Sequence, residues 1–108
     1  MKRFKTASNR VLMAVKTRLC EVLGDNLRRV ILFGSRSRED ARKDSDYDIL
    51  VLVEKRTPAI EDQVDAVAYE MLAQRSAVVT IFVEELATYD RTPHEPLFCN
   101  IRQEGAVL

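Results

Sequence analysis

Residues 33–48 read FGSRSREDARKDSDYD, and this stretch holds the features that decide the fold. Gly34 follows a short apolar run that predicts a buried strand. A residue without a side chain lets the backbone turn sharply there and approach a ligand closely. Ser35 adds a hydroxyl beside freed backbone N–H groups, which together suit phosphate oxygens. The sequence therefore predicts a phosphate-binding turn at the end of this strand.

Two aspartates, Asp46 and Asp48, close the same stretch as the next apolar run, 49–53, begins. Strand side chains alternate between the two faces, so both carboxylates are expected on one face. Two neighbouring carboxylates repel each other unless a cation lies between them, and hard oxygen ligands of this kind suit Mg²⁺. A Gly-Ser turn or an Asp-x-Asp pair alone is commonly structural. Their combination in one loop between two apolar strands favours metal-assisted phosphoryl or nucleotidyl transfer.

The rest of the chain predicts an α+β fold in the order α-β-β-α-β-α-(β). Ser8 is the expected N-cap of the first helix, and Thr57-Pro58 are expected to open the second. The other expected elements come from apolar periodicity and turn residues. They are a helix over 8–23, strands over 29–33, 48–53 and 77–83, a helical turn over 84–89, a helix over 93–102 and a last strand over 105–108.

Composition limits the classes of protein to consider. The chain has 108 residues, 46% hydrophobic and 31% charged, which predicts a single globular domain over 1–108 without a membrane span. The formal net charge is zero, which disfavours nucleic acid as a partner. Basic residues nevertheless gather in the first 43 positions. This skew is consistent with an ordinary solvated helix face, or with a positive rim around a triphosphate site or an acidic partner.

The two cysteines match no metal or redox spacing. Cys20 and Cys99 lie far apart in the sequence, and we expect both to be buried as small hydrophobic residues. Free cysteines of this kind are typical of a reducing compartment, so we expect the protein in the cytoplasm.

The chain resembles the nucleotidyltransferase superfamily that includes DNA polymerase beta. Gly34-Ser35, ten intervening residues and Asp46-Tyr47-Asp48 look like its GS-x10-D-x-D signature, and the nearest resemblance is to the minimal nucleotidyltransferase branch. Leu32-Phe33, Ser45, residues 49–51 and the ending 100–108 extend it over most of the chain. The resemblance implies a nucleotidyltransferase fold with a small mixed β-sheet backed by helices.

The resemblance also implies roles for the site. Nucleotide and phosphate binding would fall to Gly34, Ser35, Arg36 and Ser45, while Asp46 and Asp48 would be the catalytic pair that ligates Mg²⁺. Many such proteins are antitoxins of HEPN-domain partners, and some transfer AMP from ATP onto the toxin. The expected ligands are thus ATP or another nucleoside triphosphate and a HEPN-domain protein, with a homo-oligomer or hetero-oligomer as the expected assembly.

The sequence departs from the family pattern at two places. Glu39 stands where relatives commonly carry a second glycine. Active relatives also supply a third carboxylate from a later strand, but the aligned place here is near Val79 or Thr80. Glu84 and Glu85 follow too far along to be expected substitutes. A missing general base typically costs about 10²–10⁴-fold in rate.

Two functions therefore remain open from the sequence. The first is Mg-dependent transfer of a nucleoside monophosphate, AMP from ATP, to a hydroxyl of a partner protein. Its rival is a weak or inactive module that neutralises its partner by binding alone. The Asp46/Asp48 pair favours the enzyme, whereas the missing third acid favours the rival.

Overall fold

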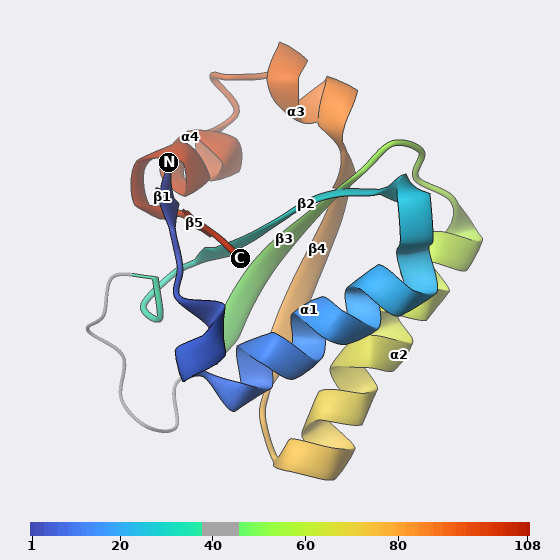
Figure 1. Cartoon of the computed structure of the whole chain (residues 1–108). Coiled ribbons are helices and arrows are strands. Elements are labelled where there is room, and N and C mark those ends of the chain that lie inside the picture. Colours follow the sequence, from blue (N-terminus) through green and yellow to red (C-terminus); the bar gives the residue numbers. More distant parts are fainter. Residues whose placement is uncertain (38–45) are drawn as a thin grey trace.

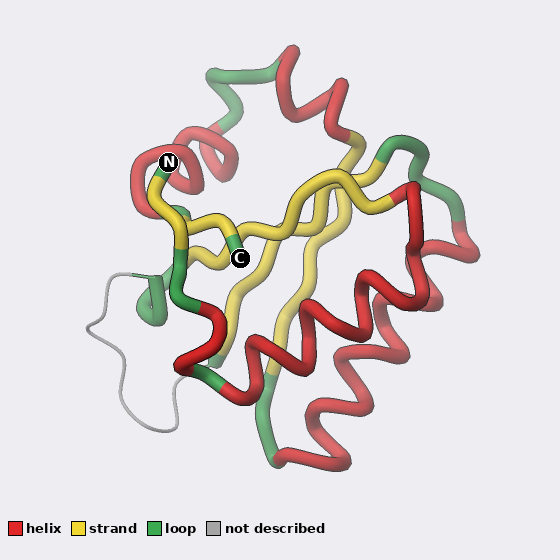
Figure 2. Tube along the Cα trace, in the orientation of Figure 1, coloured by secondary structure: helices red, strands yellow, loops and turns green. Residues whose placement is uncertain are grey.

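The computed structural model describes residues 1–37 and 46–108, and it shows a mixed sheet between two pairs of helices (Figures 1 and 2). The strands follow the spatial order β1-β5-β2-β3-β4. The elements in chain order are β1 (Lys2–Arg3), a 3₁₀ turn (Thr6–Ser8), α1 (Arg10–Leu23), a second 3₁₀ turn (Gly24–Asn26), β2 (Leu27–Phe33), β3 (Tyr47–Val53), α2 (Pro58–Arg75), β4 (Val79–Glu85), α3 (Leu86–Arg91), α4 (Pro96–Glu104) and β5 (Ala106–Val107).

Strand pairing makes the sheet mixed, as the resemblance implies. β2 runs antiparallel to β3, whereas β3 and β4 are parallel and are joined by the crossover helix α2. β5 pairs antiparallel with β2 and parallel with β1, so the two ends of the chain lie side by side (Figure 1). The predicted order of elements is confirmed, and the structure adds β1, whose two residues are too few to show a period of two in the sequence.

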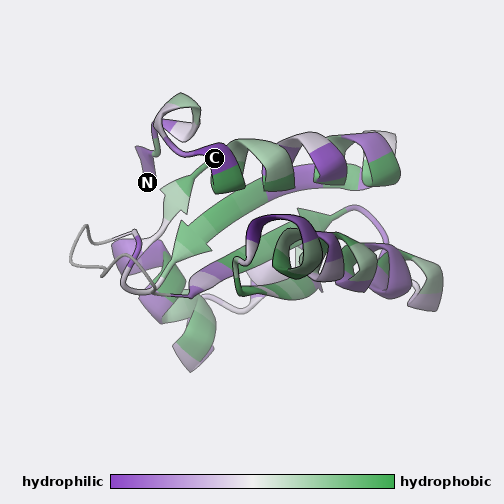
Figure 3. Cartoon of the chain, turned by 90° about the horizontal axis from the view of Figure 1, so that it is seen from below, coloured by the Kyte–Doolittle hydropathy of each residue, from purple (hydrophilic) through white to green (hydrophobic). Residues whose placement is uncertain are grey.

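Each face of the sheet packs on its own helix pair. Along β3, Tyr47, Ile49 and Val51 belong to the core formed with α1 and α2. The alternate residues Leu50 and Leu52 belong to a smaller core with α3 and α4. Hydrophobic residues dominate the central strands, whereas the helices alternate between hydrophilic and hydrophobic residues (Figure 3). This alternation determines which face carries each side chain near the start of β3.

The starts of the two long helices show how local chemistry sets the boundaries. Thr57 is the N-cap of α2 as predicted, because its hydroxyl accepts a hydrogen bond from the Ile60 amide at 3.2 Å. The expected Ser8 cap of α1 is wrong. Asn9 takes that role through a 3.0 Å bond from Leu12 N to its side-chain oxygen, so the helix starts at Arg10. Within the described residues no helix is long and apolar enough to cross a membrane.

The later elements are displaced by two or three residues from their expected positions. β4 starts at Val79 rather than at residue 77, because the left-handed Ser76, with φ of 52°, ends α2 and leads into a short connection. It continues to Glu85, so the expected turn over 84–89 becomes α3 only at Leu86. The helix expected over 93–102 begins at Pro96, where proline suits the first turn, and ends at Glu104.

The cysteine burial expected from the sequence is wrong. Cys20 is exposed on α1 and Cys99 is only half-buried on α4, and both are free. Cys20 directly follows the fully buried Leu19, so the helical period of about 3.6 residues turns it away from the core. The cytoplasmic location remains a prediction.

Candidate functional site at the start of the third strand

The turn after β2 is held by a compact set of hydrogen bonds. Gly34 has a positive φ of 75°, a conformation that favours glycine. Its carbonyl oxygen accepts bonds from the amide of Ser37 at 3.1 Å and from the Ser37 hydroxyl at 2.7 Å. Lys2 Nζ donates to the Ser37 carbonyl at 2.7 Å, and Ser37 is completely buried. The backbone at Gly34-Ser35 is therefore fixed before any ligand binds.

The turn and Asp48, the second aspartate of the pair, lie against each other. Asp48 pairs with Phe33 across β2 and β3, directly before Gly34. A Cβ placed on Gly34 would lie only 2.5 Å from Asp48 Oδ2. Asp46 is exposed and Asp48 half-buried, while Tyr47 between them points into the opposite core. Because successive side chains along a strand point to opposite faces, both carboxylates lie on the face of the sheet that carries α3 and α4.

Tyr47 anchors this start of β3 on the other face. Its hydroxyl accepts a hydrogen bond from Asn9 Nδ2 at 3.2 Å, and its amide donates to the Val78 carbonyl at 3.0 Å. The guanidinium of Arg36 lies 4.1 Å from the centre of the Tyr47 ring. This cation–π contact holds Arg36, one of the expected phosphate-binding residues, close to the residue that separates the two aspartates.

A third carboxylate near the site comes from α4, a helix that the sequence predicts but does not connect with the site. Glu104, the last residue of α4, accepts a hydrogen bond from the Gly34 amide at 3.1 Å. The close approach of the end of α4 to β2 depends on Gly105, because a Cβ at that position would lie 2.8 Å from Ile31 Cγ2. The only sequence signal was the family resemblance of the ending 100–108. That resemblance does not indicate a contact between Glu104 and Gly34, which are 70 residues apart in the chain.

The surroundings of Asp48 disfavour its charge. Burial raises the pKa of the Asp48 carboxyl above its ordinary value, and the nearby charges of Asp46 and Glu104 raise it further. In each case the ionised form of Asp48 is the disfavoured one. The free protein therefore holds Asp48 in an environment that a bound cation would relieve.

Glu104 variants provide a first test of this arrangement. Glu104→Ala removes the acceptor of the Gly34 amide, whereas Glu104→Gln keeps an acceptor of similar shape. We expect the alanine variant to be less stable than the glutamine variant by about 1 kcal/mol in urea unfolding. Both substitutions should lower the pKa of Asp48, followed by NMR, because each removes a like charge. Equal stability of the two variants would show that the hydrogen bond contributes nothing.

β4 supplies no carboxylate beside the aspartates. Thr80 is the register partner of Asp48, and its neighbours Val79 and Ile81 face the α1/α2 core, so Thr80 lies on the face of Asp48. Glu84 and Glu85 pair with Leu52 and Val53, four and five positions further along the strand, or about 13 Å and about 17 Å away. Both also contact Arg56. Neither can replace the missing acid, as their position in the sequence indicates.

The donor set at this site fits Mg²⁺ as an oxygen-liganded ion that keeps part of its hydration. Within residues 1–37 and 46–108, no group of three or more His, Cys, Asp or Glu side chains forms a ready metal centre. Mg²⁺ is commonly bound by one or two carboxylates together with water and substrate phosphates. Two exposed or half-buried aspartates that repel each other match that requirement. Ser45 and Glu39, both named from the sequence, lie outside the described residues.

Comparisons with known proteins agree with this geometry. A family model described as the nucleotidyltransferase domain matches residues 12–105. A protein of Methanocaldococcus jannaschii named "Putative protein adenylyltransferase" is 30% identical over 91 residues, which cover 73% of this chain and 91% of that protein.

Two solved structures share the fold at low sequence identity. One is a chain of a toxin–antitoxin complex with AMP-PNP, 18% identical with a TM-score of 0.61, covering 86% of this chain and 68% of that one. Another belongs to the complex of a tri-AMPylated Shewanella oneidensis HEPN toxin with an MNT antitoxin, 17% identical with a TM-score of 0.55, covering 90% and 70%. The family match spans the phosphate turn, the aspartate pair and all of α4, and the chain therefore belongs to the nucleotidyltransferase domain family.

Proposed function

We propose that this chain transfers AMP from ATP to a hydroxyl group of a partner protein, and that it acts as the antitoxin of a HEPN-domain toxin. The observation that carries the proposal is the packing of the Gly34 turn against Asp48 on adjacent strands. This contact brings phosphate donors and metal-binding carboxylates to one point. The name of the Methanocaldococcus jannaschii relative and the titles of the two similar complexes support the choice of AMP and of the partner.

Each residue has a proposed task in the transfer. Ser35 and the turn amides hold the triphosphate, while Arg36, and Ser45 from the undescribed stretch, add contacts to its oxygens. Asp46 and Asp48 bind Mg²⁺, which supplies positive charge against the phosphates when present. A new bond forms between the acceptor oxygen and the α-phosphorus as the bond to the β-phosphate oxygen breaks. Pyrophosphate leaves, and the hydroxyl proton passes to solvent, since Thr80 is no base.

Label transfer tests this proposal directly. The chain is incubated with Mg²⁺, ATP and the product of the neighbouring gene, which we expect to be a HEPN-domain protein. Nucleotidyl transfer predicts label on the partner from ATP labelled at the α-phosphate and none from ATP labelled at the γ-phosphate. Label from the γ-position would instead indicate phosphoryl transfer and contradict the proposal.

A second candidate function is supported by one observation. Thr80 stands opposite Asp48, where active relatives are expected to carry the third acid. A domain with this site could bind nucleotide without turnover and neutralise its toxin by contact alone. Absence of label from both forms of ATP, with the toxin still neutralised, would establish this function in place of transfer.

The Thr80→Asp variant tests whether this position limits the rate. Its carboxylate would lie on the face of Asp48 and at the same register, where it could accept the proton of the acceptor hydroxyl. We expect kcat/KM for transfer to rise by about 10- to 100-fold. Thr80→Asn, which has the same shape without the charge, is the matched control and should show no rise. If Thr80→Asp binds Mg²⁺ and ATP normally but is no faster, the third acid is not what limits transfer.

A further inference from the structure

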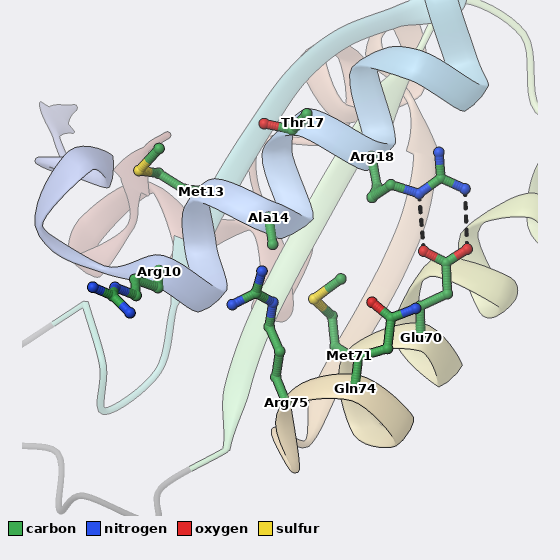
Figure 4. Close-up of a pocket in the computed structure, with 9 residues that line it drawn as sticks. All are labelled: Arg10, Met13, Ala14, Thr17, Arg18, Glu70, Met71, Gln74 and Arg75. Atoms are coloured by element: carbon green, nitrogen blue, oxygen red, sulfur yellow. Dashed lines mark hydrogen bonds and ion pairs between the residues drawn. The ribbon is translucent and has the colours of Figure 1, made fainter.

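Figure 4 shows a groove between α1 and α2. These helices pack on the face of the sheet opposite the one that carries the aspartates. The groove is open to solvent and has a volume of about 460 Å³. Its apolar part includes Ala14 and the buried Met71, with Met13, 47% exposed, at its rim. Met13 and the half-buried Ala14 are the apolar side chains that a segment lying in the groove could reach.

The charges in the groove are distributed unevenly along it. At one end the guanidinium of Arg18 forms two hydrogen bonds with the Glu70 carboxylate, at 2.9 and 3.0 Å, so these charges satisfy each other. Arg10 and Arg75 lie toward the other end (Figure 4). Both are exposed, and neither has a carboxylate partner among the residues that the structure describes. This end of the groove is therefore positively charged and available to an anionic group.

The positive end of the groove is also the end nearest the proposed site. Arg10 follows Asn9, whose side chain donates to the Tyr47 hydroxyl. Arg75 is the last residue of α2, and the chain reaches Val78 three residues later, where the carbonyl accepts from the Tyr47 amide. A segment lying in the groove would thus emerge close to the residue between the two aspartates.

We propose that this groove binds an acidic segment of a partner protein that carries apolar side chains. The exposed guanidinium groups of Arg10 and Arg75 would hold its carboxylates, and Met13 and Ala14 would contact its apolar residues. The zero net charge of the chain argues against a nucleic-acid backbone as the occupant. Binding of this segment does not depend on the proposed function. The same partner would also be the acceptor of AMP, and that part rests on the proposed function.

Binding can be tested without ATP or Mg²⁺, so failure of the groove and failure of transfer are distinguishable. The probe is a short synthetic peptide of Glu and Leu residues, titrated into the whole labelled protein and followed by amide NMR shifts. We expect saturable shifts of the amide signals of α1 and α2. Added salt should weaken the binding that these shifts report. An Arg10→Gln/Arg75→Gln variant should bind about tenfold or more weakly. The helices should persist, because glutamine is a good helix former.

Matched variants separate the groove from a general charge effect. Arg29→Gln/Arg91→Gln removes the same charge at two exposed positions outside the groove and should bind the peptide normally. Met13→Gln should weaken binding, whereas Leu72→Gln, at a similarly exposed position that does not line the groove, should not. The proposal is overturned if no saturable shift appears, if a peptide with Gln in place of Glu binds equally well, or if a single-stranded oligonucleotide binds as tightly.

Discussion

Replacing Asp46 and Asp48 together with asparagine is expected to lower AMP transfer to the partner by about 10³-fold or more, with the fold intact. Asparagine keeps the shape of each side chain but removes the charges that attract a cation. Transfer is measured with ATP labelled at the α-phosphate. We expect Mg²⁺ to raise the melting temperature of the wild-type protein and not that of the variant. That stabilisation is worth about 2.7 kcal/mol at a ligand concentration 100 times Kd.

The stability of this variant without Mg²⁺ has a predicted sign. Because burial, Asp46 and Glu104 raise the folded pKa of Asp48, its ionisation is less favourable in the folded than in the unfolded state. The ionised Asp48 therefore lowers the folding stability at neutral pH, and this effect disappears as the pH falls below 3.8, the ordinary pKa of an aspartate. The double variant should therefore be at least as stable as wild type at pH 7, and the difference should vanish in acid.

A matched control excludes a general effect of lost negative charge. Asp62→Asn/Asp65→Asn makes the same chemical change at two exposed positions of α2 and should leave both transfer and the Mg²⁺ response unchanged. Full transfer by the Asp46/Asp48 variant would rule out these aspartates as the metal-binding pair. Loss of label together with unchanged toxin neutralisation would show that neutralisation does not need the catalytic pair.

Gly34→Ala is expected to damage both stability and activity. The positive φ of 75° strains any residue with a Cβ, and that Cβ would meet Asp48 Oδ2 at 2.5 Å. The turn and the aspartate must then separate, so we expect a loss of about 2–4 kcal/mol in urea unfolding and of most of the label transfer.

Gly24→Ala provides the control, since Gly24 also has a positive φ, of 54°, but a Cβ there meets nothing within 4 Å. The Gly24→Ala protein should lose only about 1–3 kcal/mol of folding stability from backbone strain, and it should keep its transfer activity. A second control combines Gly34→Ala with Asp48→Ala, which removes the clashing carboxylate. When Asp48 is alanine, Gly34→Ala should lower the free energy of unfolding by no more than Gly24→Ala does. A Gly34→Ala protein with normal transfer would show that the contact with Asp48 is not needed.

The parts of the fold that sequence reasoning placed well depend on interactions within one element. The apolar runs of β2 and β3 indicate buried strands, and Thr57 followed by proline indicates a helix start that the structure confirms. Errors arose where two local solutions compete. Ser8 and Asn9 can both cap a helix, and only the bond to Leu12 shows which residue does so.

The elements that sequence reasoning missed depend on distant partners. β1 has two residues and exists because it pairs with β5 at the other end of the chain. The exposed position of Cys20 follows from where neighbouring elements cover α1, which residue type alone does not specify. Hydrophobic residues outside the core are common on protein surfaces, so residue identity could not predict this position.

By itself, the sequence determined that Gly34 would follow one buried strand and that Asp46 and Asp48 would lie at the start of the next. The strand period of two and the need for a glycine at a sharp turn are local properties, and both appear in residues 33–48. Only the tertiary structure decided that Glu104 contacts the Gly34 amide, that Thr80 stands opposite Asp48, and that Arg10 and Arg75 share a groove. The physical reason is that helix packing and strand register bring together residues far apart in the chain.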